Sequence, residues 1–143
     1  MIITIRPAEL DDYEKVIPLL NGFVGEDRYS KHDNDSFEKI IESKSNFIYV
    51  AVNEEKIIGF ITFSVRNVVR YPKPIVEVDE LFVAITYQKH GVGGRLMQQM
   101  EEDAKSLGCH AIFIESGYDH KPAHKFYEKL QYKNYGYHFK KVL

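Results

Sequence analysis

A strand pattern followed directly by a glycine-rich turn and an amphipathic helix constrains this fold more than any other feature of the sequence. The run IVEVDELFVAI, residues 75–85, is the longest strand candidate, and QKHGVGG, residues 88–94, follows it closely. In the next run, GGRLMQQMEEDAKSLG, apolar side chains recur at helical spacing, at Leu96, Met100, Ala104 and Leu107. The pattern predicts a strand, a tight turn, and a helix that begins inside the glycine segment.

Strand and helix patterns also alternate along the N-terminal half. IITIR predicts a first strand, and apolar side chains at steps of three and four from Leu10 to Leu20 predict a helix that Pro18 should bend or shorten. The run NGFVGEDRYSKHDND is polar and contains glycine, so we expect a loop there. DSFEKIIES then predicts a short helix with Asp35 or Ser36 as its N-cap.

Further strands and one more helix complete the chain. FIYVAV and KIIGFITFSV flank the turn NEE and predict a hairpin. HAIFIES predicts a strand, KPAHKFYEKL a helix with Pro122 in its first turn, and QYKNYGYHFKKVL a closing strand. The order β-α-α-β-β-β-α-β-α-β predicts an α/β fold, with a mixed sheet flanked by helices in one domain over residues 1–143.

Composition and charge exclude several classes of protein. The net charge of −2 argues against a general nucleic-acid or membrane binder, and no apolar run reaches transmembrane length. Cys109 is the only cysteine, so no internal disulfide forms, and the N-terminus has no apolar run of signal-peptide length. We therefore expect a cytoplasmic protein.

The glycine segment has the physical properties of an anion site. The first N–H groups of a helix have no partner within the helix, and glycines remove the side chains that would keep an anion away from them. Arg95 and Leu96 follow Gly94, which excludes a Walker loop, and the dinucleotide fingerprint would need glycine in place of Leu96. Alternatively, the glycines only make a tight turn and allow close helix packing.

The strand before the glycines changes phase. Apolar residues alternate at Val76 and Val78, and the alternation resumes at Leu81 after Asp79 and Glu80. One extra residue of this kind predicts a β-bulge, which would free backbone groups to pair with an amide-bearing ligand as an added strand does. A strand buried on both faces would also lack strict alternation, so an accidental slip is the alternative.

These residues resemble a known family. VDELFVAITYQKHGVGGRLM resembles the acetyl-CoA-binding motif of the GNAT N-acetyltransferase superfamily, whose pattern Q/R-x-x-G-x-G/A is filled by Gln88, Gly91 and Gly93. IRPAELDD is similar to the family's first strand and helix start, and KPAHKFYEKLQY to its later helix. The resemblance covers essentially the whole chain, and it implies a mostly antiparallel sheet with a bulged central strand.

The resemblance also implies how acetyl-CoA would bind as co-substrate. The N–H groups of one segment would hold its pyrophosphate: Gln88, Lys89, His90, Gly91, Val92, Gly93 and Gly94. Its pantetheine arm would pair with the backbone of Leu81, Phe82 and Val83. His120 stands where the family often has an Asn that contacts the arm, and residues 130–143 leave little room for the family's C-terminal hairpin.

Carboxylates near the phase slip fit the chemistry of an amine acceptor. An amine has a pKa of about 10, so it must lose a proton before it can attack a thioester. By match to the family motif we favour Glu80 and Asp79 over Glu77 for this step; solvated or ion-paired carboxylates are the alternative. Four more acids, Glu26, Asp27, Asp33 and Asp35, lie in the loop that borders the acceptor in the family.

Tyr127 is the candidate for the leaving group. Its helix carries an apolar stripe formed by Ala123, Phe126, Tyr127 and Leu130, which by itself indicates a core residue. The resemblance implies instead that the Tyr127 hydroxyl points at the cofactor sulfur. His120 and His124 are four residues apart, but no third ligand is evident, so we expect no metal. The aromatic tail after residue 131 is interpreted as core packing.

The sequence therefore predicts an acyltransferase that moves an acetyl group from acetyl-CoA to a primary amine, by direct attack in a ternary complex. The acceptor would be a small molecule or a peptide, with no nucleic acid or membrane as partner, and a homodimer is possible. The alternative is a non-catalytic acyl-CoA-binding sensor or interaction module. A small nucleotide-binding protein is a third and weaker interpretation.

Overall fold

The computed structural model describes all 143 residues, which divide into two compact units, Met1–Phe113 and Ile114–Leu143. Five strands form one sheet in the order β1-β2-β3-β4-β5. The α/β fold with a mixed, mostly antiparallel sheet is confirmed. Whether residues 1–143 make a single domain stays a prediction. No helix of the chain is long and apolar enough to cross a membrane.

The sheet is built from β1 (Thr4–Pro7), β2 (Asn46–Asn53), β3 (Lys56–Arg66), β4 (Ile75–Val83) and β5 (Ile112–Ile114). The first four strands pair antiparallel with their neighbours. The predicted hairpin is confirmed: Asn53 pairs with Lys56, and Glu54 and Glu55 turn the chain with φ of 47° and 66°. Both values are left-handed, as a two-residue turn between twisted strands requires.

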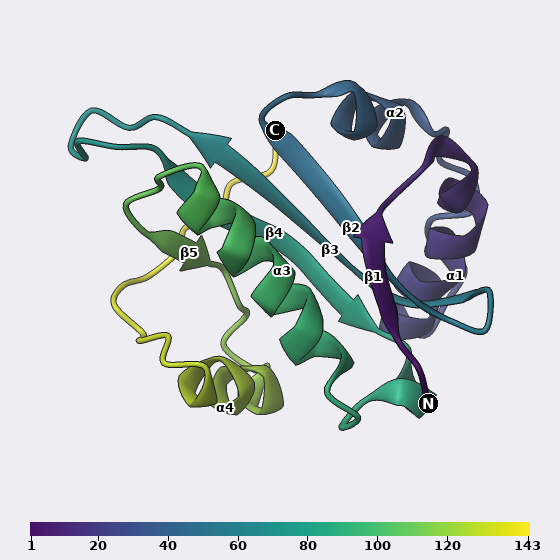
Figure 1. Cartoon of the computed structure of the whole chain (residues 1–143). Coiled ribbons are helices and arrows are strands. Elements are labelled where there is room, and N and C mark those ends of the chain that lie inside the picture. The colour runs from purple at the N-terminus through teal and green to yellow at the C-terminus, as the bar shows by residue number, and fades with distance from the viewer. The chain divides into compact units, whose positions relative to one another are not determined.

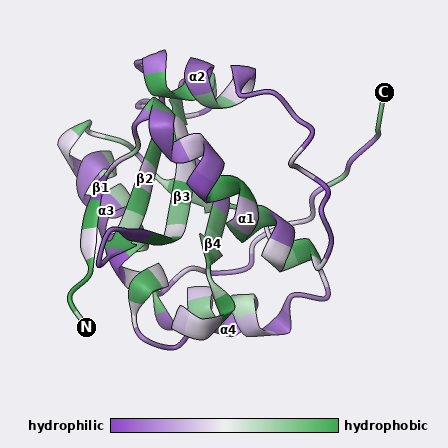
Figure 2. Ribbon diagram, turned by 90° about the vertical axis from the view of Figure 1, so that its right-hand side faces the viewer, coloured by the Kyte–Doolittle hydropathy of each residue, from purple (hydrophilic) through white to green (hydrophobic).

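Helices cover both faces of this sheet within the first unit. α3 (Val92–Ser106) lies across one face (Figure 1) and buries Val92, Leu96, Met97, Met100 and Ala104. α1 (Tyr13–Val24) and α2 (Asp35–Glu42) lie over the other face, in front of β2, β3 and β4 in Figure 2, where the strands are largely green and hydrophobic. The cluster under α1 and α2 is made by buried residues that include Val16, Phe37, Ile48, Val50 and Phe60.

Two local predictions in this region are wrong: that Pro18 shortens the first helix, and that Asp35 or Ser36 is the N-cap of the second. A bend at Pro18 stays a prediction. α1 begins at Tyr13, after a 3-10 turn at Leu10–Asp12, and it continues past Pro18 to Val24. Pro18 is exposed, so its ring lies on the solvent side while the opposite face of α1 packs on the sheet. The N-cap of α2 is Asn34, one residue before the predicted Asp35.

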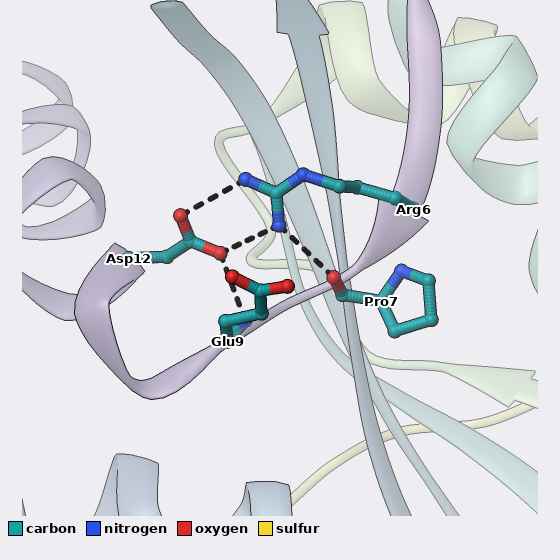
Figure 3. A network of polar contacts seen from close by, with 4 residues as sticks. All are labelled: Arg6, Pro7, Glu9 and Asp12. Atoms are coloured by element: carbon teal, nitrogen blue, oxygen red, sulfur yellow. Dashed lines mark hydrogen bonds and ion pairs between the residues drawn. The ribbon is translucent and has the colours of Figure 1, made fainter. Parts of the chain in front are cut away.

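A partly buried ion pair fixes the chain between β1 and α1 (Figure 3). Asp12, which is 3% exposed, accepts hydrogen bonds from Arg6 Nη1 at 2.7 Å and Nη2 at 3.0 Å, and from the Glu9 N–H at 2.8 Å. Arg6 Nη1 also donates to the Pro7 carbonyl at 3.1 Å. The hydrogen bonds from Arg6 hold the pKa of Asp12 below its usual value, against the effect of burial.

Polar contacts also hold α3 against the sheet. Arg95, in its first turn, donates to the Ile3 carbonyl before β1. Nearer its end, Asp103 accepts from the Tyr49 hydroxyl at 2.5 Å and from the Gln99 side chain at 3.2 Å. Burial, and then the bond to Asp103, raise the pKa of Tyr49 to about 12. The glycine segment therefore leads into a helix that is attached to β1 and β2.

The second unit contains α4 (Lys121–Lys129), with Pro122 in its first turn as predicted. The predicted closing strand is wrong, because residues 131–143 form no strand. The predicted core packing of the tail is also wrong: Tyr135, Tyr137 and Phe139 are 72%, 74% and 94% exposed. Alternating side chains make a strand only where another strand accepts its backbone hydrogen bonds.

Candidate functional site

The predicted bulge is present in β4. Thr62 of β3 pairs with Glu80 and the next residue, Phe63, pairs with Val78, so Asp79 is the additional residue. The register makes Val78 share a face with Phe63, whereas Glu80 shares the opposite face with Thr62. In a regular strand, Glu80 would share a face with Val78, two residues earlier, and would lie on the apolar face covered by α3. The bulge therefore directs a carboxylate to the α1 and α2 face.

Glu80 is held where it lies by a buried hydroxyl. Thr62 is 4% exposed, and its Oγ1 donates to Glu80 Oε1 at 2.9 Å. Glu80 is half-buried, so its carboxylate keeps access to the space beside it. A hydrogen bond to one carboxylate oxygen fixes the side chain and leaves lone pairs on the other oxygen for a ligand proton.

Glu80 and Thr62 lie at a cleft of about 540 Å³. Its walls come from α1, the loop after α1, α2 and the sheet. Phe37, Ile48 and Phe60 supply buried apolar surface, and Tyr29 and Asp33 come from the loop. A cleft of this volume, lined by both apolar and polar side chains, has the dimensions of a small-molecule site.

The remaining predicted carboxylates have other surroundings. Glu77 pairs with Arg66 at 2.5 Å, and Asp79 is exposed. In the loop, Glu26 pairs with Arg28 at 2.5 Å. Asp27 accepts from Asn21, whereas Asp33 lines the cleft. Asp35 opens α2 and does not line the cleft. Of the four loop acids, the structure brings only Asp33 to the cleft that holds Glu80.

One amide organises the loop after α1, residues 25–34, which we call the acceptor loop. The Asn21 side chain accepts from the N–H groups of Arg28 and Tyr29, both at 2.9 Å. It donates to Asp27 Oδ1 at 3.1 Å and to Ser30 Oγ at 3.0 Å. Two acceptor and two donor contacts use the full capacity of the amide, so the loop has a fixed path beside the cleft.

The glycine segment, residues 88–94, opens α3 as predicted. Gly91 is the N-cap with φ of 81°, and the first intrahelical bond runs from the Arg95 N–H to its carbonyl at 3.1 Å. The preceding N–H groups, on Val92, Gly93 and Gly94, therefore have no acceptor within the helix. A Cβ added at Gly94 would meet no atom within 4 Å, so close packing does not explain this glycine. The open space beside free donors fits a bound pyrophosphate.

The other members of the segment are exposed. Gln88, Lys89 and His90 all face solvent, and Lys89 has a φ of 64°. His90 Nδ1 lies 2.8 Å from the Gln88 carbonyl. Lys89 and Gly91 both have left-handed backbone conformations, so the chain makes a tight turn before α3 begins.

The backbone of β4 after the bulge offers two residues to a ligand. The Ala84 N–H donates to the Ile58 carbonyl at 2.8 Å, so Phe82, two residues earlier, also directs its backbone groups to β3. Leu81 and Val83 direct theirs the other way. Gln88 Nε2 donates to the Val83 carbonyl at 3.1 Å. The Phe82 ring packs on Phe60 at 5.3 Å. The binding of the pantetheine arm by Leu81, Phe82 and Val83 stays a prediction, and in this geometry Leu81 and Val83 have the backbone groups that point away from β3.

Tyr127 and His120 belong to the second unit. Tyr127 is half-buried and packs edge-on against Phe126 at 5.3 Å and Tyr132 at 6.4 Å. Burial raises the pKa of its phenol. His120 is the exposed N-cap of α4, and His124 Nε2 lies 2.8 Å from the Gly117 carbonyl. No group of three or more His, Cys, Asp or Glu residues in the chain could hold a metal ion.

Three residues of the site were not found from the sequence: Thr62, Asn21 and the Gln88 side chain in its contact with Val83. The partner of Thr62 depends on the register across the bulge, so only the phase slip could have indicated it. Asn21 precedes a glycine in a polar run, which indicates a turn but not four contacts.

Comparisons with known proteins agree with this geometry. The chain is 21% identical over 142 residues to the aminoalkylphosphonate N-acetyltransferase of Salmonella typhimurium, covering 99% of this chain and 92% of the relative. A structure named as a transcriptional regulator of Bacillus halodurans superposes with a TM-score of 0.91 at 26% identity, covering 99% of this chain and all of the other.

An aminoglycoside acetyltransferase from an uncultured soil sample has the same fold. It superposes with a TM-score of 0.88 at 21% identity and covers 99% of this chain and 96% of its own. The profile of the acetyltransferase (GNAT) family matches residues 9–132, and these include the bulge, the glycine segment and α4. The chain belongs to the acetyltransferase (GNAT) family.

Proposed function

We propose that this enzyme transfers the acetyl group of acetyl-CoA to the primary amine of a small acceptor, by direct attack in a ternary complex. The observation that carries the proposal is the bulge at Asp79, because one irregularity in β4 has two consequences. It directs Glu80 into the cleft, and it is followed by Leu81 and Val83 with their backbone groups turned away from β3. A cytoplasmic location and a homodimer stay predictions.

The residues present fit acetyl-CoA. The N–H groups of Val92, Gly93 and Gly94 would bind the pyrophosphate, and the backbone of Leu81 and Val83 would pair with the pantetheine arm. Gln88 would share or release the Val83 carbonyl, which has two lone pairs. The bound thioester supplies an acetyl group that a neutral amine can attack.

Glu80 is proposed as the general base. The acceptor arrives mostly as an ammonium ion, which the negative carboxylate attracts, and Glu80 removes its proton directly or through water. The Thr62 hydroxyl orients one carboxylate oxygen, leaving the other for the proton. Asp79 is the second candidate for the general base. Glu77 is not proposed because its carboxylate forms an ion pair with Arg66.

Glu80→Gln tests this assignment. We expect kcat/KM for the amine to fall about a hundredfold, with the largest loss at low pH, where the neutral amine is scarcest. The same strand supplies a matched control in Glu77→Gln, which should keep its activity. Rates of thiol release across pH measure both variants. Parental rates and pH profiles for Glu80→Gln and Asp79→Asn alike would refute the role of the carboxylates.

Tyr127 is proposed to donate a hydrogen bond or a proton to the leaving sulfur. Burial raises the pKa of this phenol, so it keeps its proton through the neutral range. Tyr127→Phe should lower kcat about tenfold while acetyl-CoA binding stays nearly unchanged, the pattern of a contact made in the transition state. Normal turnover with a large loss of thermal stability would instead make Tyr127 a packing residue.

The alternative is a sensor that binds acyl-CoA without chemistry. Calorimetry with acetyl-CoA and thiol release over a panel of amines separate the two functions. Tight binding with no thiol release from any amine would favour the sensor.

A further inference from the structure

We infer that the acceptor is a primary amine with a single positive charge, carried on an aromatic or branched aliphatic body. This inference rests on the proposed function, since it assumes that the cleft at Glu80 receives the acceptor. It concerns the class of amine, which neither the fold nor the glycine segment specifies. Three properties of the cleft carry it: its apolar walls, its charge and its fixed shape.

Apolar side chains line much of the cleft: seven of its fifteen lining residues are aliphatic or phenylalanine, and two more are tyrosines. The sheet contributes Ile48 and Phe60, which are 6% and 1% exposed, and α2 contributes Phe37. On α1, Ile17 and Leu20 line the cleft and are half-buried, so part of their apolar surface remains open to a ligand. A hydrophobic acceptor body would remove this surface from water, whereas a hydrated sugar or phosphonate would leave it without a matching surface.

The charge of the cleft suits one cation. Its charged lining residues are Lys31, Asp33 and Glu80, and their net charge is −1. An ammonium ion on the acceptor balances this sum. A polycation would carry charges in excess of the available carboxylates, and a phosphonate would meet two carboxylates with only one lysine.

The acceptor loop, which forms one wall of the cleft, is held in place by hydrogen bonds within the protein. The Tyr13 hydroxyl, on α1, shares its one proton between the carbonyls of His32 and Asp33, at 2.9 and 3.1 Å. Together with the Asn21 contacts, these bonds join both ends of the acceptor loop to α1. Because the wall is ordered in advance, little entropy is lost on binding, and the shape of the cleft selects the acceptor.

A panel of four amines tests the inference: 2-phenylethylamine, tobramycin, 2-aminoethylphosphonate and a lysine peptide. With acetyl-CoA saturating, thiol release should give 2-phenylethylamine a kcat/KM at least about tenfold above each of the others, or about 1.4 kcal/mol. A higher value for any of the other three would overturn the inference while leaving the proposed function intact.

Two variants tie the preference to the cleft. Ile17→Asp adds a charge to the apolar wall and should lower kcat/KM for 2-phenylethylamine about tenfold. Lys31→Glu, at an exposed position, makes the lining more negative and should raise kcat/KM for tobramycin severalfold. Lys15→Glu is the matched control, because exposed Lys15 on α1 does not line this cleft, and it should change neither value. Equal effects of the two lysine variants would overturn the inference.

The two levels of proposal can fail separately. If acetyl-CoA binds but no amine releases thiol, the proposed function is wrong. In that case, calorimetry that measures the binding of 2-phenylethylamine to the CoA-loaded protein tests the inference about the acceptor. Binding that Ile17→Asp weakens would support the cleft as a site for apolar amines, and no binding by the parent protein would overturn it. Circular dichroism checks whether Ile17→Asp is folded. If Ile17→Asp is unfolded, Lys31→Glu gives a second readout.

Discussion

The glycine segment and the acceptor loop are both irregular segments beside a helix, yet they are held in different ways. Each contains a left-handed glycine, Gly91 with φ of 81° and Gly25 with φ of 75°. In the glycine segment, the conformation leaves main-chain N–H groups at the start of α3 without acceptors. The main chain of the acceptor loop is instead bound by a side chain of α1: Asn21 accepts hydrogen bonds from the N–H groups of Arg28 and Tyr29.

This difference explains why the proposed cofactor side of the site has a short sequence motif and the proposed acceptor side does not. A pyrophosphate is bound by backbone donors, so its site needs glycine at fixed positions and little else. In the proposed site the acceptor is bound by side chains, and two proteins to which this chain is similar carry the names of different acceptors, an aminoalkylphosphonate and an aminoglycoside. The acceptor side therefore follows from three-dimensional contacts and not from a short pattern.

The largest effect is expected where a side chain fills the space beside the backbone donors. Gly94→Val should weaken acetyl-CoA binding about a hundredfold, or about 2.7 kcal/mol, because the new atoms occupy the open space at the start of α3. The protein itself should fold normally, since a Cβ there meets no atom within 4 Å. Calorimetry and circular dichroism check both expectations.

Gly22→Val is the matched control for this comparison. Gly22 is another helical glycine with no atom within 4 Å of an added Cβ, but it lies in α1. It should leave acetyl-CoA binding unchanged. If Gly94→Val binds acetyl-CoA as tightly as Gly22→Val, the glycine segment is not the pyrophosphate site.

A smaller effect, on stability, is expected at the ion pair that leads into α1. Asp12→Asn should cost about 2 kcal/mol of unfolding free energy at pH 7, reduced from a fully buried pair because the Arg6 side chain is 34% exposed. The pKa of Asp12 is lowered by folding, so its contribution is present above the unfolded value of about 3.9. It is lost as pH falls through the folded pKa.

Urea unfolding between pH 7 and pH 2 measures this dependence. The difference between parent and Asp12→Asn should shrink towards zero as the pH falls. Glu26→Gln breaks a second arginine–carboxylate pair, whose two side chains are more than half exposed, and should have no measurable effect. A constant difference at every pH would show that Asp12 acts through packing and not through its charge.

The smallest effects are expected from alanine substitutions in the two segments, which should raise the KM of different substrates. Gly91→Ala and Gly25→Ala each force alanine into a left-handed conformation, at a cost of about 1 to 2 kcal/mol. We expect Gly91→Ala to raise the KM of acetyl-CoA severalfold, and Gly25→Ala to raise that of the amine. Initial rates with both substrates varied distinguish them. A rise in the same constant for both variants would contradict the comparison.

Several features of the site could be predicted from local sequence. The phase slip around Asp79 predicted the bulge, since side chains alternate with a period of two and an extra residue must reverse them. The glycines before an apolar stripe predicted the start of α3, because glycine alone adopts the conformation of Gly91 at little cost. The roles of Glu80, Tyr127 and the glycine segment stay predictions.

The failures share a cause. Residues 131–143 have the alternation of a strand, but a strand also needs a partner, and the segment forms none. The alternation of side chains is a property of the segment itself, whereas pairing depends on what lies beside it. The same reason explains why Pro18 did not shorten α1, whose packing on the sheet stabilises the helix beyond the proline.

By itself, the sequence determined the order of the elements from β1 to α4, the bulge in β4 and the glycine-bearing start of α3. Each of these depends on the backbone preferences and spacing of neighbouring residues. The tertiary structure decided which residues meet: Thr62 with Glu80, Tyr13 with the carbonyls of His32 and Asp33, and Asp33 with the cleft. These contacts join segments separated along the chain, and their partners are fixed only when strand register and helix packing bring the segments together.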